Sequence, residues 1–287
     1  MTTKTKSLLK RKSHVVSQGP SRAAARAMLR AVGLTDSDMD KPFAAVANLA
    51  SDVTPCNVHL GRIAEKVKDG LHKAGSVPFM FGTITISDGI SMGTEGMKAS
   101  LVSREVIADS IETVCFGESM DGLVVVAACD KNMPGALMSM ARLNIPSLFV
   151  YGGAILPGNY RGKDINVQDM FEAVGAHSQG KLTFDELIEM EKVACPGEGA
   201  CSGMFTANTM ASAIEAMGMS IPGTASIPAV DNRIELLAYQ AGSVLQNLLE
   251  KDLKPRDIIT RESLENAITV VLAMGGSTNA VLHLLAI

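Results

Sequence analysis

Short apolar runs of strand length alternate with longer, helically patterned segments through the first half of the chain. Leu, Val and Ala fill residues 123–128 without interruption, which is typical of a strand buried on both faces. Comparable runs predict strands at 43–50, 79–86 and 147–151, and helical periodicity predicts helices at 21–32, 57–74, 100–114 and about 132–142. This alternation predicts an α/β fold, with a mainly parallel sheet flanked by helices.

The pattern becomes almost wholly helical after about residue 160. Helices are expected at 167–178, 184–193, 205–217, 232–249 and 261–273, with glycine-rich breaks at 195–203 and 275–278. No linker is evident, so we expect one α/β domain over residues 14–287 with a helical elaboration. The closing residues VLHLLAI continue a helical pattern with no stop signal, and we expect a chain truncated at its carboxyl end.

Composition limits the classes of protein to consider. Hydrophobic residues make up 47% and charged residues 20%, which indicates a globular chain. The net charge of -4 argues against nucleic acid as a partner, and no apolar run is long enough for a membrane span. Residues 1–13 read as a basic, solvated, flexible tail. We expect a cytoplasmic protein, with an organelle stroma or matrix left open.

Five cysteines in an apolar-rich chain do not suggest a disulfide scaffold. They fit a reducing compartment, where cysteines in loops are more often metal ligands or reactive thiols than structural bridges. Cys195 and Cys201 bracket a glycine-rich segment, but this spacing matches no standard zinc or ferredoxin pattern, and Cys-x2-Cys is absent. Zinc-ribbon and ferredoxin readings are therefore disfavoured.

The tripeptide Cys129-Asp130-Lys131 follows a predicted strand and joins two kinds of metal donor. Soft sulfur suits iron or zinc, whereas carboxylate oxygen suits magnesium or calcium. Lysine beside a cation ligand is unfavourable unless its charge is removed, for instance by conversion to a carbamate. Taken alone, the tripeptide is more typical of a surface Asp–Lys pair beside a buried cysteine.

Two further residues follow predicted strands. Asp88 precedes Gly89, although Asp-Gly is first of all a turn signal. Cys56 precedes a predicted helix whose amino terminus would favour its thiolate, and the alternative is a buried, inert thiol. Since parallel strands end at one edge of a sheet, we expect Cys56, Asp88 and the 129–131 tripeptide to share one rim.

Four segments occur in a specific order: SDVTPCN from Ser51, SDGISMGTEGMKASLVSREVIADSIE from Ser87, CDKNMPGALM from Cys129 and GACSGMFTANTM from Gly199. In this wording and order the chain resembles the dihydroxy-acid dehydratase family, relatives of phosphogluconate and sugar-acid dehydratases. The resemblance runs from about residue 14 to the last residue. It rests on the wording of the motifs and not on composition or periodicity.

The resemblance implies a division of roles among the candidates. It makes Cys56, Cys129 and Cys201 ligands of a [2Fe–2S] cluster, and it leaves Cys115 and Cys195 structural. It makes Asp88 and Asp130 ligands of Mg²⁺, and Lys131 a carbamylated lysine. The implied reaction is dehydration of a 2,3-dihydroxy-3-methyl acid to a 2-keto acid in branched-chain amino-acid synthesis, by a full-length protein that is a homodimer.

The resemblance also implies parts that this chain lacks. The family's proton-abstracting serine, a further glutamate ligand and a carboxyl-terminal barrel domain are expected beyond Ile287, so no catalytic base is assigned here and the chain alone is expected to be inactive. Three alternatives stay open: a phosphogluconate or sugar-acid dehydratase, an iron–sulfur protein for electron transfer or sensing, and a non-catalytic fragment. The hard donors Asp130 and Lys131 count against electron transfer.

Overall fold

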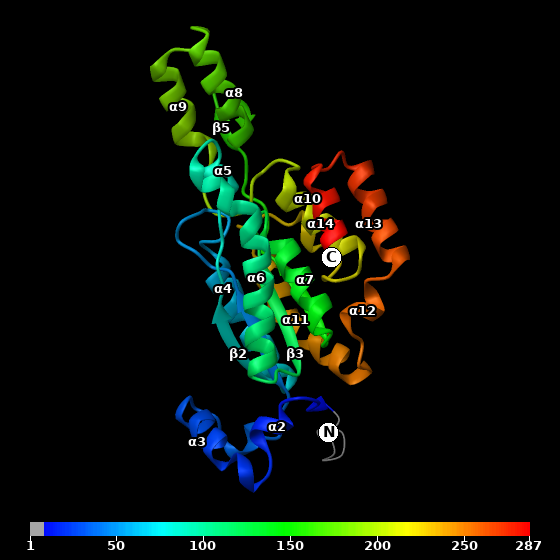
Figure 1. Ribbon diagram of the computed structural model, residues 1–287. Coiled ribbons are helices and arrows are strands. Elements are labelled where there is room, and N and C mark those ends of the chain that lie inside the picture. The colour runs from blue at the N-terminus through cyan, green and yellow to red at the C-terminus, as the bar shows by residue number, and fades with distance from the viewer. Residues whose placement is uncertain (1–8) are drawn as a thin grey trace.

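A four-stranded parallel sheet forms the centre of the computed structural model, which describes residues 9–287 (Figure 1). Its order is β2-β1-β3-β4, and every neighbouring pair runs parallel. The predicted α/β fold with a mainly parallel sheet is confirmed. The strands are β1 (Phe43–Asn48), β2 (Val77–Gly82), β3 (Gly122–Ala127) and β4 (Ser147–Tyr151).

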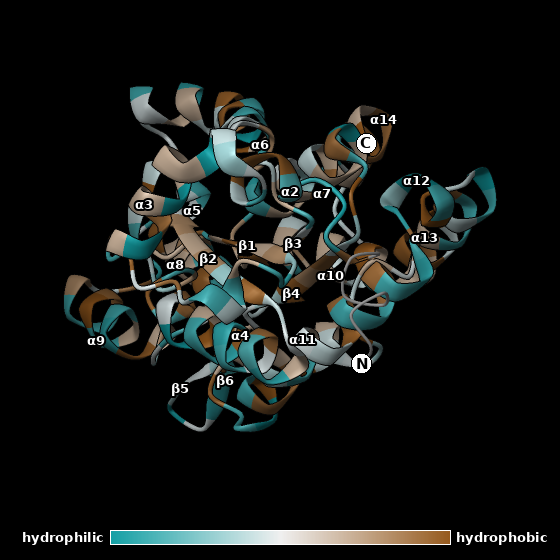
Figure 2. Cartoon of the chain, turned by 90° about the horizontal axis from the view of Figure 1, so that it is seen from below, coloured by the Kyte–Doolittle hydropathy of each residue, from teal (hydrophilic) through white to brown (hydrophobic). Residues whose placement is uncertain are grey.

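Helices cover both faces of this sheet, as Figure 2 shows along the strands. One face carries α4 (Leu60–Ala74) and α11 (Arg233–Lys251), and the other carries α6 (Lys98–Gly117) and α7 (Asn132–Leu143). Because both faces are covered, every residue of β3 is buried, which explains its unbroken apolar run.

The direction of winding reverses at the middle of the sheet. From β1 the chain passes through α4 to β2, then returns past β1 through α6 to β3 and continues through α7 to β4. Asn48 pairs with both Gly82 and Val126, so these strands end at one edge. A ligand crevice is expected between the carboxyl ends of β1 and β3, where the reversal occurs.

The helices α4 and α11 approach each other unusually closely. A Cβ atom on Gly70 would lie 1.9 Å from the carbonyl oxygen of Tyr239, and one on Gly242 would lie 2.1 Å from the carbonyl carbon of Gly70. The two glycines thus permit backbone contact between the helices. This contact fixes α4, whose preceding loop carries Cys56.

The expected helical elaboration begins after a small hairpin that the sequence pattern missed. Strands β5 (Gly158–Tyr160) and β6 (Lys163–Ile165) pair antiparallel, and three residues each is too short for a visible alternation. The helices α8 (Val167–Ser178) and α9 (Phe184–Ala194) project with this hairpin from one end of the molecule (Figure 1). The remaining helices are α10 (Thr206–Ala216), α12 (Pro255–Ile258), α13 (Arg261–Ala273) and α14 (Asn279–Ala286).

Residues 9–13 are held against the sheet. The buried carboxylate of Asp121 accepts hydrogen bonds from the backbone amides of Lys12, Ser13 and Phe43 at 2.6, 3.0 and 2.8 Å, and one from the Ser13 hydroxyl. The prediction of a solvated, flexible tail over residues 1–13 is therefore wrong for residues 9–13, while residues 1–8 lie outside the described residues. The following segment forms α2 (His14–Ser17), η1 (Pro20–Arg22), α3 (Ala23–Ala31) and η2 (Asp36–Asp38).

The strand that was predicted to end at residue 86 ends four residues earlier. Ladder pairing stops at Gly82, and Thr85 instead bonds to Asn132 beside the site. Two short helical turns follow, α5 (Asp88–Ser91) and η3 (Glu95–Met97). None of the helices found in residues 9–287 has the length and apolarity needed to cross a membrane.

Candidate metal centre

Three free thiols from three separate loops meet at the carboxyl edge of the sheet. Cys56 lies between β1 and α4, Cys129 follows β3, and Cys201 precedes α10. The Cys129 thiol donates to Ile86 O at 3.5 Å, and the Cys56 thiol interacts with those of Cys129 and Cys201. The switch point of the sheet therefore gathers the three cysteines singled out in the sequence.

The charges of these three thiols depend on one another. Hydrogen bonds from Cys129 and then Cys201 outweigh burial and lower the pKa of Cys56 to about 3. The same bonds, together with burial, raise the pKa of Cys129 and of Cys201 well above the ordinary thiol value. Burial and the neighbouring thiols thus oppose the ionisation of more than one of the three. Soft sulfur donors of this kind fit iron.

Oxygen donors lie directly beside the thiols. The Lys131 ammonium donates to Asp88 Oδ2 at 2.7 Å and lies 3.8 Å from Asp130 Oδ2. Ser100, in α6, donates to the other oxygen of Asp88 at 2.5 Å. Asp88 and Lys131 are both buried, so this is a desolvated charge cluster and not the surface Asp–Lys pair that the tripeptide alone favoured.

Burial and mutual repulsion set the two carboxylates apart. Burial, and next the charge of Asp88, raise the pKa of Asp130 to about 7. Burial also pushes the pKa of Asp88 upward, but hydrogen bonds from Lys131 and Ser100 overcome it, so the net pKa is lowered. A buried carboxylate beside a partly buried one favours positive charge next to them, which fits a hard cation such as Mg²⁺. An ammonium group cannot itself coordinate that cation.

Both sets of donors face one cavity of about 240 Å³. Lys131 lies behind it, against Asp88. The other walls are largely apolar, from the loop after α5, from α8 and from the start of α10, which would limit water at the site. The lining residues are Cys56, Ser87, Asp88, Gly89, Met92, Cys129, Asp130, Val167, Gln168, Phe171, Cys201 and Phe205.

Two fully buried amides tie the loops together, and sequence reasoning did not single them out. Asn57 Nδ2 donates to Leu49 O at 2.5 Å and to Asn132 Oδ1 at 2.8 Å. Asn132 Oδ1 also accepts from the Cys129 amide at 3.2 Å, while its Nδ2 donates to Thr85 Oγ1 at 3.1 Å. Asn132 thus fixes the loops that carry Cys56, Cys129 and Asp88. Its place in the CDKN motif was the available signal.

A third amide holds the Cys201 loop. Asn208, in α10, donates to the carbonyls of Cys201 and Gly203 at 2.6 Å each. Its own Oδ1 accepts from the buried hydroxyl of Tyr151, at the end of β4, at 2.6 Å. The third thiol is therefore anchored to the sheet, although it lies some fifty residues beyond β4 in the sequence.

The remaining two cysteines have different surroundings. Cys115 is buried in α6, and burial raises its pKa to about 12. Cys195 is exposed and borders a second cavity, of about 130 Å³, together with Cys56 and Cys201. Its structural role remains a prediction, and it borders the same cavity as two thiols of the triad.

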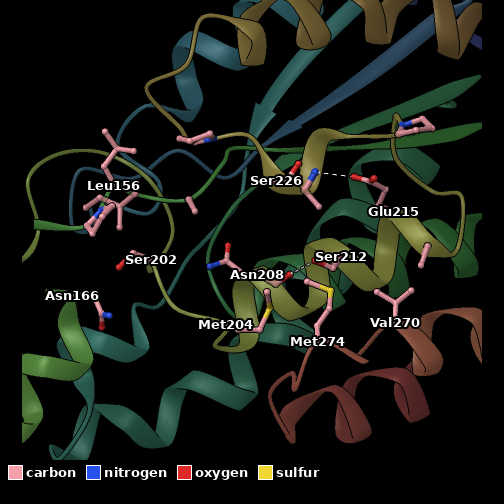
Figure 3. Close-up of a pocket in the computed structure, with 17 residues that line it drawn as sticks. Leu156, Asn166, Ser202, Met204, Asn208, Ser212, Glu215, Ser226, Val270 and Met274 are labelled. Carbon is pink, nitrogen blue, oxygen red and sulfur yellow. Dashed lines mark hydrogen bonds between the residues drawn. The ribbon is translucent and has the colours of Figure 1, made fainter. Parts of the chain in front are cut away.

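A larger cavity, of about 670 Å³, is lined by Ser202 and Met204 after Cys201 and by residues of α10 and α13 (Figure 3). Of its described lining residues only Glu215 is titratable, and that carboxylate accepts from the amides of Gly223 and Ala225 at 2.7 and 2.8 Å. Glu215 is thereby committed to stabilising a turn. The smaller cavity with the thiols and carboxylates is accordingly the candidate site.

Within residues 9–287 no group of three or more His, Cys, Asp or Glu side chains stands in the arrangement of a preformed metal site. The Lys131 ammonium instead pairs with Asp88, and the Cys129 thiol donates to Ile86 O. The structure thus brings the six predicted residues together. Their roles as ligands remain predictions.

The fold and the site define an α/β domain with thiols and carboxylates gathered at the switch point of its sheet. A family model described as dihydroxy-acid/6-phosphogluconate dehydratase N-terminal matches residues 41–287. The chain belongs to this family.

Curated relatives agree with this membership. The dihydroxy-acid dehydratase of Nitrosomonas eutropha is 58% identical over 277 residues, which is 96% of this chain and 50% of the relative. Those of Synechococcus sp. (strain JA-3-3Ab) and Chloroflexus aurantiacus (strain ATCC 29366 / DSM 635 / J-10-fl) are 58% and 57% identical, each over 96% of this chain and 49% of the relative. The chain spans about half the length of the curated relatives it matches.

Proposed function

We propose that this chain supplies the metal-binding half of a hydro-lyase that converts a 2,3-dihydroxy-3-methyl carboxylic acid to its 2-keto acid. One observation carries the proposal: three thiols and two carboxylates, those of Asp88 and Asp130, border the same 240 Å³ cavity. A dehydration needs one centre that accepts the leaving hydroxyl and another that stabilises charge on the substrate carboxylate. Two different donor sets, side by side, meet that need.

In this proposal the thiolates of Cys56, Cys129 and Cys201 hold a [2Fe–2S] cluster, and Asp88, Asp130 and carbamylated Lys131 hold Mg²⁺. Bound there, the cluster supplies a Lewis acid with one open coordination position, and Mg²⁺ supplies charge stabilisation for the substrate carboxylate and 2-hydroxyl. Donor chemistry supports both assignments, because soft sulfur and hard oxygen are separated within one site.

The chain's own residues would position the proposed thiol ligands and keep water out of the cavity. Asn132 keeps the Cys56 and Cys129 loops in register, and Asn208 does the same for Cys201. Phe171 and Phe205 line the cavity and would exclude water from it. No described residue is assigned as the base that removes the C2 proton.

The substrate class rests on the relatives. Those cited above are named dihydroxy-acid dehydratase, which favours the dihydroxy acid. The matching family model also names 6-phosphogluconate dehydratases, so a phosphorylated sugar acid is the second candidate. The branched-chain pathway, a cytoplasmic location and a homodimeric full-length enzyme belong to the same proposal.

A chimaera tests the function directly. Residues 1–287 would replace the matching half of the Nitrosomonas eutropha enzyme, and 2-keto acid formation would be followed from 2,3-dihydroxy-3-methylbutanoate and from 6-phosphogluconate. We expect turnover of the first substrate and little of the second. A chimaera that holds iron but forms no keto acid from either compound would overturn the proposal, and preference for 6-phosphogluconate would transfer it to the second candidate.

A further inference from the structure

His283, in helix α14, is a buried histidine that has no role in the site described above. It has no solvent exposure, and its Nε2 atom has no hydrogen-bond partner. Its other ring nitrogen, Nδ1, lies 3.4 Å from the Arg104 guanidinium. Since arginine only donates, Nδ1 must accept, and the proton of the neutral ring must lie on Nε2.

Because the proton lies on Nε2, the atom without a partner is a buried donor, which is unusual. The other buried side-chain atoms without a partner, among residues 9–287, are Asn57 Oδ1, His59 Nδ1 and Asp252 Oδ1. The first and last are acceptors, and His59 Nδ1 is one too because Nε2 of that ring faces the Gly152 carbonyl at 2.8 Å. Buried N–H donors without acceptors are rarer and more costly than acceptors without donors. His283 Nε2–H is therefore a buried donor without an acceptor among the described residues.

The surroundings of His283 indicate where that acceptor would lie. Helix α14 packs against α7, whose amino-terminal cap residue is Lys131, and against α10. Burial and then the charge of Lys131 lower the pKa of His283 to about 4. The ring is thus neutral near pH 7. Its contact Arg104 lies one turn of α6 after Ser100, the residue that donates to Asp88, which places the ring on the side of α6 that faces the Lys131–Asp88 pair.

A lysine ammonium cannot satisfy this donor, because it carries three donors and no acceptor. We propose that His283 is a positioning residue that donates Nε2–H to a carbamate oxygen on Lys131. This inference rests on the carbamylated lysine of the proposed function. The modification consumes CO2: the Lys131 ammonium loses two protons, a bond forms between Nζ and the carbon, and the product carries one negative charge. The change turns a group of donors into a group with two acceptor oxygens beside Asp130.

The test measures the carbamate itself, without any assay of activity. The full chain would be equilibrated with ¹³C-bicarbonate and Mg²⁺, and its carbamate resonance followed by ¹³C NMR. We expect one signal that Lys131→Met abolishes. Replacement by leucine, His283→Leu, should raise the bicarbonate concentration for half-occupancy about tenfold, as expected for one hydrogen bond to a charged group. His283→Gln, which keeps an N–H near the Nε2 position, should restore much of the occupancy. His177→Leu, on the surface helix α8, is the matched control.

The outcomes separate the two proposals. Absence of any Lys131-dependent signal in the wild-type chain would overturn the carbamate and this inference with it. A wild-type signal unchanged by His283→Leu would overturn this inference alone. Should the leucine variant fold poorly, ¹⁵N correlation spectra of the wild-type ring decide, since a proton on Nδ1 instead of Nε2 contradicts the inference.

Discussion

The side-chain amide of Asn57 donates to the side-chain oxygen of Asn132 at 2.8 Å, in a fully buried environment. Asn57 directly follows Cys56, and Asn132 lies three residues after Cys129. The bond therefore joins two loops that leave different strands. The geometry of the thiols is thereby set by neutral amides that need no metal.

Replacing Asn132 should lower both the free energy of unfolding and the amount of cluster bound. Asn132→Ala leaves buried partners on Asn57, Thr85 and the Cys129 amide unsatisfied, and we expect a loss of about 2–4 kcal/mol in the free energy of unfolding. Urea titration measures the loss, and iron content after reconstitution should fall with it. Asn159→Ala, at an exposed hairpin position, is the control and should change stability by less than about 0.5 kcal/mol. Equal effects of the two variants would refute the role of Asn132.

Magnesium binding should depend on Asp130. The Asp130→Asn substitution removes one of two adjacent carboxylates, and we expect Mg²⁺ affinity to fall on the order of tenfold in isothermal titration with bicarbonate present. Asp109→Asn changes a largely exposed carboxylate paired with Arg142 and should leave affinity unchanged. An unaltered dissociation constant for the Asp130 variant would remove this residue from the site.

A pH dependence is expected from Lys10, far from the metal site. Burial, opposed by the charge of Asp121, lowers the pKa of Lys10 from 10.5 to about 8, while its ammonium donates to Lys41 O at 2.8 Å and lies 3.8 Å from the centre of the Phe43 ring. A lowered folded-state pKa means that the unfolded chain binds more protons between pH 8 and 10.5, so this residue adds stability as pH rises through that window.

The effect is isolated by comparing wild type with Lys10→Met. The difference in unfolding free energy should shift in favour of wild type by about 3 kcal/mol between pH 7.5 and 10.5. Urea titrations at several pH values measure it. A difference that does not vary with pH would show that Lys10 is not buried as described.

Two helical glycines offer a matched test of the packing beneath the Cys56 loop. Gly70→Ala would place a Cβ atom 1.9 Å from Tyr239 O, and separating α4 from α11 should cost at least about 3 kcal/mol. Gly175, in α8, has nothing within 4 Å of such an atom, so Gly175→Ala should stabilise by about 0.5–1 kcal/mol. Thermal unfolding distinguishes the two, and a neutral Gly70→Ala would contradict the close helix contact.

The core of the fold was predictable because its pattern is strong. Unbroken apolar runs such as Leu123–Ala128 are typical of strands in a sheet with both faces covered. In the helices after residue 160, apolar residues recur every three to four positions. The hairpin of β5 and β6 was not, since three-residue strands have no visible period. The end of β2 was missed because Thr85 leaves the ladder to bond with Asn132, a long-range contact that local propensity does not encode.

The candidate site divides in the same way. Motif wording selected the six residues, and the rule that parallel strands end at one edge placed five of them on a rim. Cys201 joins them only through Asn208 and Tyr151, and the nearness of Cys195 and His283 depends on how distant helices pack. Such contacts follow from the tertiary structure and leave no local signal.

The most direct test of the account is the iron and acid-labile sulfide content of single cysteine variants after anaerobic reconstitution. We predict about two irons and two sulfides per wild-type chain, as for one [2Fe–2S] cluster. Cys56→Ala, Cys129→Ala and Cys201→Ala should each lose most of both, while Cys115→Ala and Cys195→Ala should retain them. Full iron and sulfide in any of the first three variants would contradict the assignment of the thiol triad.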